Sequence, residues 1–402
     1  MSNPTDPALE PADIPHPLAA IRIALCALGF RLISAGLAWF ANLAFAPDQP
    51  AQTTMFGQPS AFWDPFTRYD AGWYYQIARN GYLFVAGGPP VGVGKPGKIA
   101  YFPLYPLLTR FASRLFGHAD ADIYFGGILV SWLSFALAMV ALFYLARLDL
   151  PQRRAERAAL LAAIFPFSFF FGMVYTEALF LLLAVASFYA FRTRQWVLGG
   201  VCGGLATATR VTGILMIVPL AWIAWRTVGT NRRDRILALV GLLLVTGGIG
   251  AYSIYVYQLS GNPFEWAASI TRWGYHPGGR PWMMPVRLVG ELLTHPYRYL
   301  STDKMALYDT LYGVTGILFA CAIPFVWYRF GAAYGLFMLL NLWLPLSSGV
   351  FEGVGRYCSV LFPCFIWLAS QRSRVFATPL VVFFALVYTL GLALFVTIHP
   401  LF

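Results

Sequence analysis

Charged side chains are scarce in this chain of 402 residues, where Asp, Glu, Lys and Arg make up 11% and hydrophobic residues 59%. A soluble globular protein carries about 25% charged residues and about 45–50% apolar ones. Water offers no favourable place for so large an apolar excess, whereas each crossing of a lipid bilayer needs about 20 mostly apolar residues. The composition therefore excludes an ordinary soluble protein and predicts an all-α polytopic integral membrane protein.

Cysteine and histidine are also rare, with five of each. Their spacing is not typical of a metal site, so neither a metal nor another cofactor is expected. The cysteines are interpreted as small packing residues, with a Cys358–Cys364 disulfide as the alternative. The sequence has no Asn-x-Ser/Thr glycosylation site with a permitted middle residue. Its absence favours a bacterial inner membrane over the alternative, the endoplasmic reticulum.

Acidic residues are outnumbered, because 28 Lys and Arg against 17 Asp and Glu give a net charge of +11. A nucleic-acid partner is not expected, since no basic patch with interleaved aromatic residues occurs. The arginines instead gather in alternate short loops, which the positive-inside rule assigns to the cytoplasm. Residues 1–18 are expected to be a disordered cytoplasmic lead into a single transmembrane domain, 19–402. About eleven transmembrane helices are predicted, at about 19–45, 122–146, 158–175, 177–191, 196–209, 212–225, 236–257, 306–328, 331–349, 357–370 and 375–398.

Two long segments, about 46–121 and 258–305, fall on the outer side in this arrangement and are rich in Trp, Tyr, Pro and Gly. Loops of this length are uncommon unless they are functional. The first segment is expected to carry amphipathic helices on the membrane surface, at about 70–80 and 103–116. The outer face is therefore where we expect the function of the protein to lie.

The first outer segment places two carboxylates, Asp64 and Asp70, among aromatic side chains at 62–82. Aromatic faces suit stacking against sugar rings, but an aromatic belt at the membrane interface gives the same enrichment. Asp70 precedes a helix-like stretch, so it is either an N-terminal cap or a general base that takes a proton from a hydroxyl nucleophile. Asp64 stands before Pro65, which favours a turn or cap role.

Further charges fall on the same outer side as Asp70, namely Glu177, Arg210, Glu352 and Arg356. The apolar runs around the first two are short, so Glu177 and Arg210 are predicted to lie at the same depth, at or below the outer interface. Charges there are costly and are expected to be paired or functional. The convergence predicts a polar site whose arginines grip phosphate. The alternative is a pair of ion pairs, Glu177–Arg210 and Glu352–Arg356, that pin helices together.

Three blocks of sequence carry a family resemblance. The first outer segment reads R-Y-D-A at 68–71, I-A-x-x-G-Y at 77–82 and Y-F-P-L-Y-P at 101–106. The apolar part reads F-P-F-S at 165–168, Y-T-E-A-L-F at 175–180 and L-A-T-A-T-R at 205–210. In this order and spacing they resemble the PIG-V-like, or GPI mannosyltransferase II-like, family. The C-terminal half resembles it only in hydropathy and in R-Y before F-P at 356–363.

The resemblance implies a GT-C glycosyltransferase fold with long outer loops, a lipid-phosphate-linked mannose donor and inversion at the anomeric carbon. Asp70 matches the acidic residue that serves this family as base. The Trp that precedes it in the family is Tyr69 here, and the Ser-Asn that follows the Arg is Val211-Thr212, so contacts to donor or acceptor are expected to differ. A bacterial chain is not expected to make GPI anchors, so the acceptor does not carry over.

The expected function is therefore an inverting membrane glycosyltransferase that moves mannose from a polyprenyl- or dolichyl-phosphate-mannose donor, held among membrane lipids, to a hydroxyl of a glycan or glycolipid on the outer face. A transporter or lipid-linked-sugar flippase is the alternative, because membrane carboxylates often relay protons and short helices build substrate sites. A third hypothesis is a non-catalytic assembly subunit, for which no polar cavity is expected at Asp70. With Asp70 as the catalytic residue, the expected substrate- and phosphate-binding residues are Arg210, Glu177, Arg356, Tyr101, Arg68, Trp73, Arg280, Lys304, Glu352 and Asp64.

Overall fold

The protein is helical throughout the part that the computed structural model describes, which contains no strand. That part comprises residues 16–49, 62–84, 97–117, 119–274, 278–302, 304–371 and 374–401. The expected all-α class is confirmed. The expected cytoplasmic lead lies outside the described residues as far as residue 15, and residues 16–18 already belong to the first helix.

Within the described residues, four helices are long and apolar enough to cross a bilayer: α1 (His16–Ala44), α4 (Asp120–Arg147), α14 (Lys304–Phe330) and α18 (Arg374–Val396). A fifth candidate is the pair α9 (Arg232–Val245) and α10 (Gly247–Ser260), which is bent by 41°. These helices make the chain an integral membrane protein. The number of crossings, about eleven, stays a prediction, because the other apolar runs form shorter helices: α5 (Gln152–Ile164), α6 (Glu177–Arg192), α7 (Trp196–Thr209), α8 (Ile217–Thr227), α15 (Ala332–Leu346) and α17 (Phe362–Ser370).

The apolar run at 158–175 is not the continuous helix that hydropathy predicts. Helix α5 ends at Ile164, because Pro166 lacks an N–H group and its ring disfavours the helical conformation for the residue before it. The short turn η3 (Ser168–Gly172) follows, and its carbonyl at Gly172 accepts a hydrogen bond from Trp132 Nε1 at 3.1 Å. Residues 161–175 are all buried, which satisfies the rule that irregular backbone at membrane depth must be covered by protein.

Backbone-to-backbone contact fixes α7 against α9 and α10. A Cβ atom at Gly200 would lie 2.3 Å from the carbonyl oxygen of Gly241, and one at Gly248 would lie 1.9 Å from that of Gly204. Only glycine allows helices to approach so closely, and small residues at this spacing are typical of tightly packed membrane helices. The contact fixes the end of α7, where Arg210 follows the last turn.

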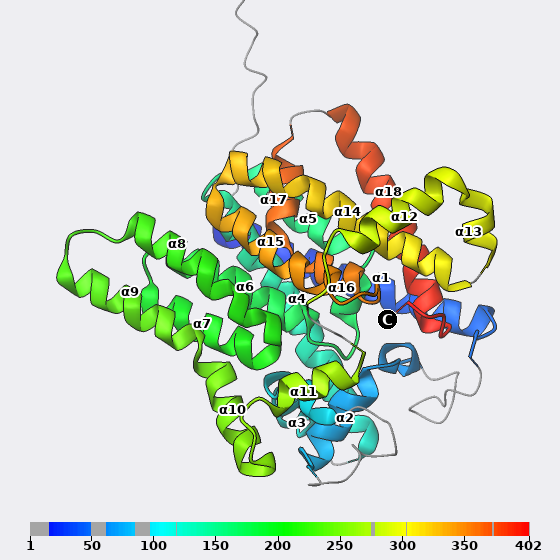
Figure 1. The fold of residues 1–402 in the computed structure, drawn as a ribbon, viewed down its shortest axis with the longest axis horizontal. Coiled ribbons are helices and arrows are strands. Elements are labelled where there is room, and N and C mark those ends of the chain that lie inside the picture. Colours follow the sequence, from blue (N-terminus) through cyan, green and yellow to red (C-terminus); the bar gives the residue numbers. More distant parts are fainter. Residues whose placement is uncertain are drawn as a thin grey trace, which may run out of the picture.

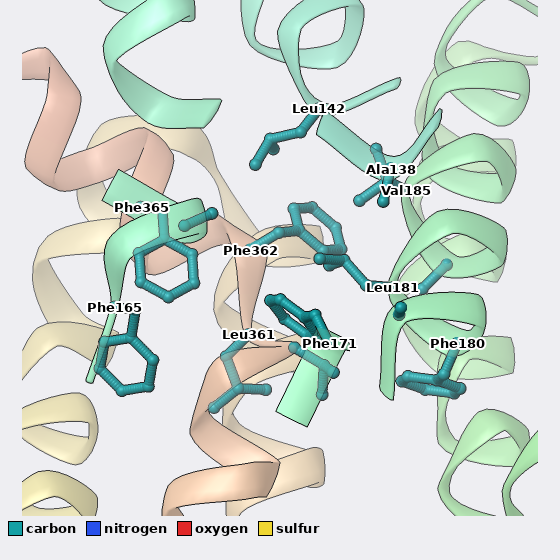
Figure 2. Close-up of a cluster of buried hydrophobic side chains, with 14 of the residues drawn as sticks. Ala138, Leu142, Phe165, Phe171, Phe180, Leu181, Val185, Leu361, Phe362 and Phe365 are labelled. Atoms are coloured by element: carbon teal, nitrogen blue, oxygen red, sulfur yellow. The ribbon is translucent and has the colours of Figure 1, made fainter. Parts of the chain in front are cut away.

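The centre of the bundle is a cluster of buried apolar side chains, drawn in Figure 2. Helix α4 contributes Leu142, α6 contributes Leu181, and the break after α5 contributes Phe165. The Phe165 ring packs edge-on against Phe365 of α17 with centroids 5.3 Å apart, a geometry that favours aromatic pairs by about 0.5–1.5 kcal/mol beyond area burial. Elements far apart in the sequence are thus locked together around one core.

All five cysteines carry free thiols. Cys358 and Cys364 are buried, the first in the short helix α16 (Val354–Ser359) and the second in α17. The packing role is therefore confirmed for these two residues, and the alternative of a Cys358–Cys364 disulfide is wrong.

Both outer segments form short helices. In the first segment they lie close to where the amphipathic pattern predicts them. That segment contains α2 (Ala71–Asn80), the turn η2 (Lys98–Ala100) and α3 (Leu104–Ser113). The second contains α11 (Glu265–Arg272), α12 (Met283–Thr294) and α13 (Pro296–Thr302). In Figure 1, α2, α3 and α11 gather at the lower end of the bundle, whereas α12 and α13 form a hairpin at its right-hand edge. The first and second outer segments therefore meet at α11.

Candidate active site

A cavity of about 720 Å³ opens where the two outer segments meet the ends of the bundle helices. Its wall comes from the start of α2, the residues around η2, the junction of α7 with the turn η4 (Val211–Met216), α11 and the connection from α15 to α16. The alternative that the protein is a non-catalytic assembly subunit does not predict such a cavity. Of the residues expected to form a site, six line it: Asp70, Trp73, Tyr101, Arg210, Glu352 and Arg356.

Two arginines and two carboxylates form a bonded cluster at this cavity. Oε1 of the fully buried Glu177 accepts hydrogen bonds from Arg210 Nη1 at 2.6 Å and from Arg356 Nε at 2.9 Å. Arg356 Nη1 also donates to Asp70 Oδ2 at 2.8 Å. Charge-assisted bonds of this length are the strong kind, and the formal charges of the four groups cancel. The prediction that Glu177 and Arg210 lie at the same depth is confirmed.

Aromatic rings also contact both guanidinium groups. The centre of the Arg356 guanidinium lies 4.7 Å from the Tyr175 ring, and that of Arg210 lies 5.0 Å from the Tyr357 ring. A cation over an aromatic face is stabilised by the ring quadrupole, most strongly where water is excluded. Each arginine is thus held by a carboxylate on one side and by a ring on another.

Asp70 is the N-cap residue of α2, but its side chain does not cap the helix. Its Oδ1 instead accepts a hydrogen bond from the Tyr101 hydroxyl at 3.0 Å, while Oδ2 faces Arg356. Tyr69, immediately before it, has φ +52°, in the left-handed region that non-glycine residues rarely adopt. Such backbone persists where surrounding contacts hold it. Here the Tyr69 hydroxyl donates to the His399 carbonyl, and the Asp70 N–H donates to the Tyr175 hydroxyl at 3.2 Å.

Asp64 and Arg68 do not line the cavity but brace the loop that carries Asp70. Arg68 Nη2 lies 2.7 Å from Asp64 Oδ2, and both side chains are buried. The same guanidinium donates to the Val396 carbonyl at 3.0 Å and to Asn42 Oδ1 at 2.7 Å. Asp64 opens the turn η1 (Asp64–Thr67), which accords with the turn role favoured for it. Arg68 thus ties the loop to the ends of α1 and α18.

The Tyr101 hydroxyl is a permanent hydrogen-bond donor to Asp70. Burial, reinforced by the nearby Asp70 carboxylate, raises the pKa of Tyr101 well above its usual range, so the phenol stays protonated at physiological pH. Its ring stacks on Trp73, with centroids 6.0 Å apart and planes 17° apart. Tyr101 therefore joins the charged cluster to an aromatic wall.

Glu352 lines the cavity but makes no ion pair within the described residues. The alternative Glu352–Arg356 pair is wrong, because Arg356 bonds Asp70 and Glu177 instead. Burial, followed by the negative charge of Asp70, raises the pKa of Glu352, and only Arg356 opposes the shift. The cavity thus holds a second carboxyl group that is more readily protonated than an ordinary glutamate.

Of two basic residues expected at the donor phosphate, one lies away from the cavity and the other has a side chain outside the described residues. Arg280 is exposed and does not line the cavity. Lys304 is the first residue of α14, and its side chain lies outside the described residues. Within the described residues, the cations that line the cavity are Arg210 and Arg356.

Several lining residues escape prediction from the sequence. Trp266 and Trp273 come from the second outer segment, whose aromatic enrichment is equally typical of a membrane interface. Tyr357 belongs to the R-Y pair at 356–357 of the family resemblance, and that pair was the available signal for it. Tyr175 does not line the cavity, but its ring lies beside Arg356 and its hydroxyl accepts from the Asp70 N–H; it opens the Y-T-E block of the family resemblance, and that block was the available signal for it.

A protein-family model described as dolichyl-phosphate-mannose-protein mannosyltransferase matches residues 95–249. The match covers less than half of the chain, and it includes Glu177 and Arg210 but neither Asp70 nor Arg356. It supports the coarser expectation, a membrane glycosyltransferase. The resemblance to the PIG-V-like family stays a prediction. A comparison with curated protein sequences found no match.

Similar solved structures include three of low sequence identity. One is the Saccharomyces cerevisiae protein O-mannosyltransferase Pmt1–Pmt2 complex bound to the sugar donor, with 14% identity and a TM-score of 0.41, covering 62% of this chain and 34% of that one. Another is Cupriavidus metallidurans ArnT bound to undecaprenyl phosphate, with 13% identity and a TM-score of 0.48, covering 92% of this chain and 76% of that one. The third is the apo Archaeoglobus fulgidus oligosaccharyltransferase, with 13% identity and a TM-score of 0.47, covering 93% of this chain and 56% of that one. The chain thus spans about a third of the yeast protein and about half of the archaeal one. Likeness this distant carries no argument about activity.

Proposed function

We propose that the protein is an inverting GT-C membrane glycosyltransferase that moves mannose from a polyprenyl-phosphate-mannose donor to a hydroxyl of a glycan or glycolipid acceptor. The observation that carries the proposal is the juxtaposition, in one cavity, of a carboxylate with two arginines: Asp70 bonded to Arg356, and Arg356 linked through Glu177 to Arg210. A base and a phosphate clamp are the two parts that transfer from a lipid phosphate requires.

The site is proposed to face the outer side, the periplasm if the membrane is the bacterial inner membrane. Helix α6 begins at Glu177 and ends at Arg192, and its 16 residues span about 24 Å at 1.5 Å per residue. Arg192 pairs with Asp149 at the far end, where Arg154 and Arg157 also donate to the carbonyls of Ser370 and Gln371 at the end of α17. The arginines of these two loops, which the positive-inside rule assigns to the cytoplasm, therefore lie at the opposite end of α6 from Glu177.

The donor phosphate is placed between Arg210 and Arg356 in this proposal. Within the described residues, Nη2 of both guanidinium groups makes no hydrogen bond to the protein, so each can donate to a phosphate oxygen without breaking its bond to Glu177. The planar fork of arginine suits this contact. Apolar lining residues such as Val211, Leu344 and Pro345 provide a compatible neighbourhood for the lipid chain.

The reaction is a single displacement. The acceptor O–H bond breaks and its proton goes to Asp70. The acceptor oxygen then bonds the anomeric carbon on the face opposite the phosphate, and the bond from that carbon to the phosphate oxygen breaks, its electron pair leaving with the phosphate. The transition state resembles an oxocarbenium ion, as in glycoside hydrolysis.

Arg356 links the two charge changes. Asp70 loses its negative charge when it takes the proton, while the leaving phosphate gains one. Because Arg356 bonds Asp70 in the resting site, its positive charge becomes available to the phosphate as the reaction proceeds. Interactions that strengthen in this way lower the barrier rather than only tightening binding. These cations supply the charge stabilisation, so the proposed reaction needs no metal, and a chelator should leave the rate unchanged.

The proposal is tested by a transfer assay with the purified full chain, radiolabelled polyprenyl-phosphate mannose and a panel of glycan, glycolipid and peptide acceptors. Label should move to a glycan or glycolipid with the wild type, whereas Asp70→Asn should lose at least about 100-fold in rate while still binding donor. Full activity in Asp70→Asn would remove this residue from the base role. If label crosses sealed vesicles without transfer, the protein is a flippase instead.

A further inference from the structure

The cavity has two unlike walls that meet at Asp70. On one side stand the cations, with Arg356 bonded to Asp70 Oδ2. On the other stand three aromatic rings: Trp73 of α2, Tyr101 after η2, and Trp273 after α11. Tyr101 reaches Asp70 Oδ1, so the two oxygens of one carboxylate face the two walls.

The three rings form a corner. Trp73 and Tyr101 stack with planes 17° apart, and Trp273 stands perpendicular to both, at 89° to Trp73 and 83° to Tyr101, with centroids 5.3 and 5.7 Å away. All three side chains are only partly buried and line the cavity. A corner of two perpendicular π-faces matches a pyranose, whose C–H faces are apolar and whose edge carries hydroxyl groups.

A second observation points to an oxygen-bearing ligand at this corner. The Trp273 indole N–H is buried and has no hydrogen-bond partner among the described residues. Buried polar groups are nearly always paired, and an indole N–H can only donate. The donor is therefore available to an acceptor oxygen that the described residues do not provide.

We infer that the corner of Trp73, Tyr101 and Trp273 is the acceptor subsite and that the acceptor presents a sugar ring to it. This rests on the proposed function for its chemistry. In a displacement with inversion, the acceptor hydroxyl approaches opposite the phosphate and must reach the base. With the phosphate at the cationic wall, the aromatic side of Asp70 is left for the acceptor. The acceptor is thus a glycan or glycolipid rather than a protein hydroxyl.

The first test measures transfer kinetics with octyl α-mannoside as acceptor, and with a Ser/Thr peptide and octanol as ring-free competitors. Trp273→Ala and Trp73→Ala should raise the acceptor KM about tenfold, while the donor KM rises much less. Trp273→Phe keeps the ring and removes only the N–H, so it should raise the acceptor KM less than Trp273→Ala does. Trp225→Ala is the matched control, because this exposed tryptophan lies outside the cavity.

A second measurement separates failure of this inference from failure of the proposed function. Saturation-transfer NMR detects binding of methyl α-mannoside to the full chain in nanodiscs without any donor or chemistry. A signal that falls in Trp73→Ala and Trp273→Ala supports the subsite even if no donor is ever turned over. Equal signals in wild type and both variants, or transfer to the peptide or octanol that matches transfer to the mannoside, would overturn the inference.

Discussion

Two buried arginine sites in the same bundle have opposite surroundings. Arg31, in α1, is 2% exposed and makes no ion pair in the described part of the chain. Its guanidinium donates to the carbonyls of Ser168 and Ala163 at 3.2 and 3.4 Å and lies 4.1 Å from the Phe135 ring. Arg356 instead bonds two carboxylates and lines a cavity.

The difference teaches what each charge is for. The carbonyls that Arg31 binds flank the break after α5, where the helix leaves acceptors without intrahelical partners. A cation near the C-terminus of a helix also gains from the helix dipole. Arg31 therefore closes a broken helix and needs no carboxylate. Arg356 sits among charges that change during the proposed reaction, so it needs partners that can exchange.

The largest effect on stability is expected from removing the Glu177 carboxylate, because the Arg356 site has such a partner and the Arg31 site has none within the described residues. Glu177→Gln leaves Arg210 and Arg356 with one negative charge between them, and breaking a buried ion pair costs about 3–5 kcal/mol. The same change gives the cluster a net positive charge, so it should bind an anionic lipid phosphate more tightly. Thermal unfolding and polyprenyl-phosphate titration of the same samples check both. Lower stability with weaker phosphate binding would favour a purely structural role as a helix clamp.

The next effect separates the two arginines directly. Arg356→Met should reduce turnover about 100- to 1,000-fold, the range observed when one donor to a developing negative charge is lost. Arg356→Lys keeps the charge without the planar fork, so its turnover should lie between that of the wild type and that of Arg356→Met. Transfer rates at saturating donor and acceptor measure this. A Met variant within threefold of wild type would show that Arg210 alone serves the phosphate.

Arg31→Met is the counterpart and should act on stability. The Ser168 and Ala163 carbonyls lose the Arg31 donor, although Ala163 keeps its hydrogen bond from the Ser168 hydroxyl. The loss should cost about 1–3 kcal/mol, while the rate in the folded fraction stays within about threefold of wild type. Thermal unfolding alongside transfer rates at low temperature separates the two quantities. If the rate falls as far as in Arg356→Met, the contrast between the two sites is wrong.

The comparison also shows how far sequence reasoning reaches. Loop parity and run length were enough to bring Glu177 and Arg210 to one depth, and the family resemblance singled out Asp70. Hydropathy could not reveal that the run at 158–175 breaks, because an apolar window reads the same whether or not Pro166 ends the helix. Arg31 was overlooked inside an apolar run, although a lone charge there is itself a signal.

Trp73 and Tyr101 of the aromatic corner were expected at the site, but their partner Trp273 lay beyond prediction for a different reason. Trp73 and Trp273 are separated by 200 positions and meet only because α11 packs beside η2. Interfacial belts enrich the same residue types, so composition could not separate the two interpretations. Asp64 and Arg68 were predicted to contact substrate, yet they brace the loop behind Asp70. Which charge faces a cavity and which faces the core is decided by tertiary packing.

The smallest expected effect concerns Glu352, the carboxyl of the cavity that has no ion-pair partner in the described residues. Burial and Asp70 raise its pKa in the folded state, and Asp309 adds to the shift while Arg356 opposes it. The folded protein therefore binds more protons here than the unfolded chain, so stability should decline as pH rises from the ordinary glutamate pKa through the raised one. Glu352→Gln cannot lose this proton and should flatten the decline. Melting temperatures measured across that pH range compare the two, and parallel curves for wild type and variant would mean that Glu352 titrates as an ordinary surface carboxylate.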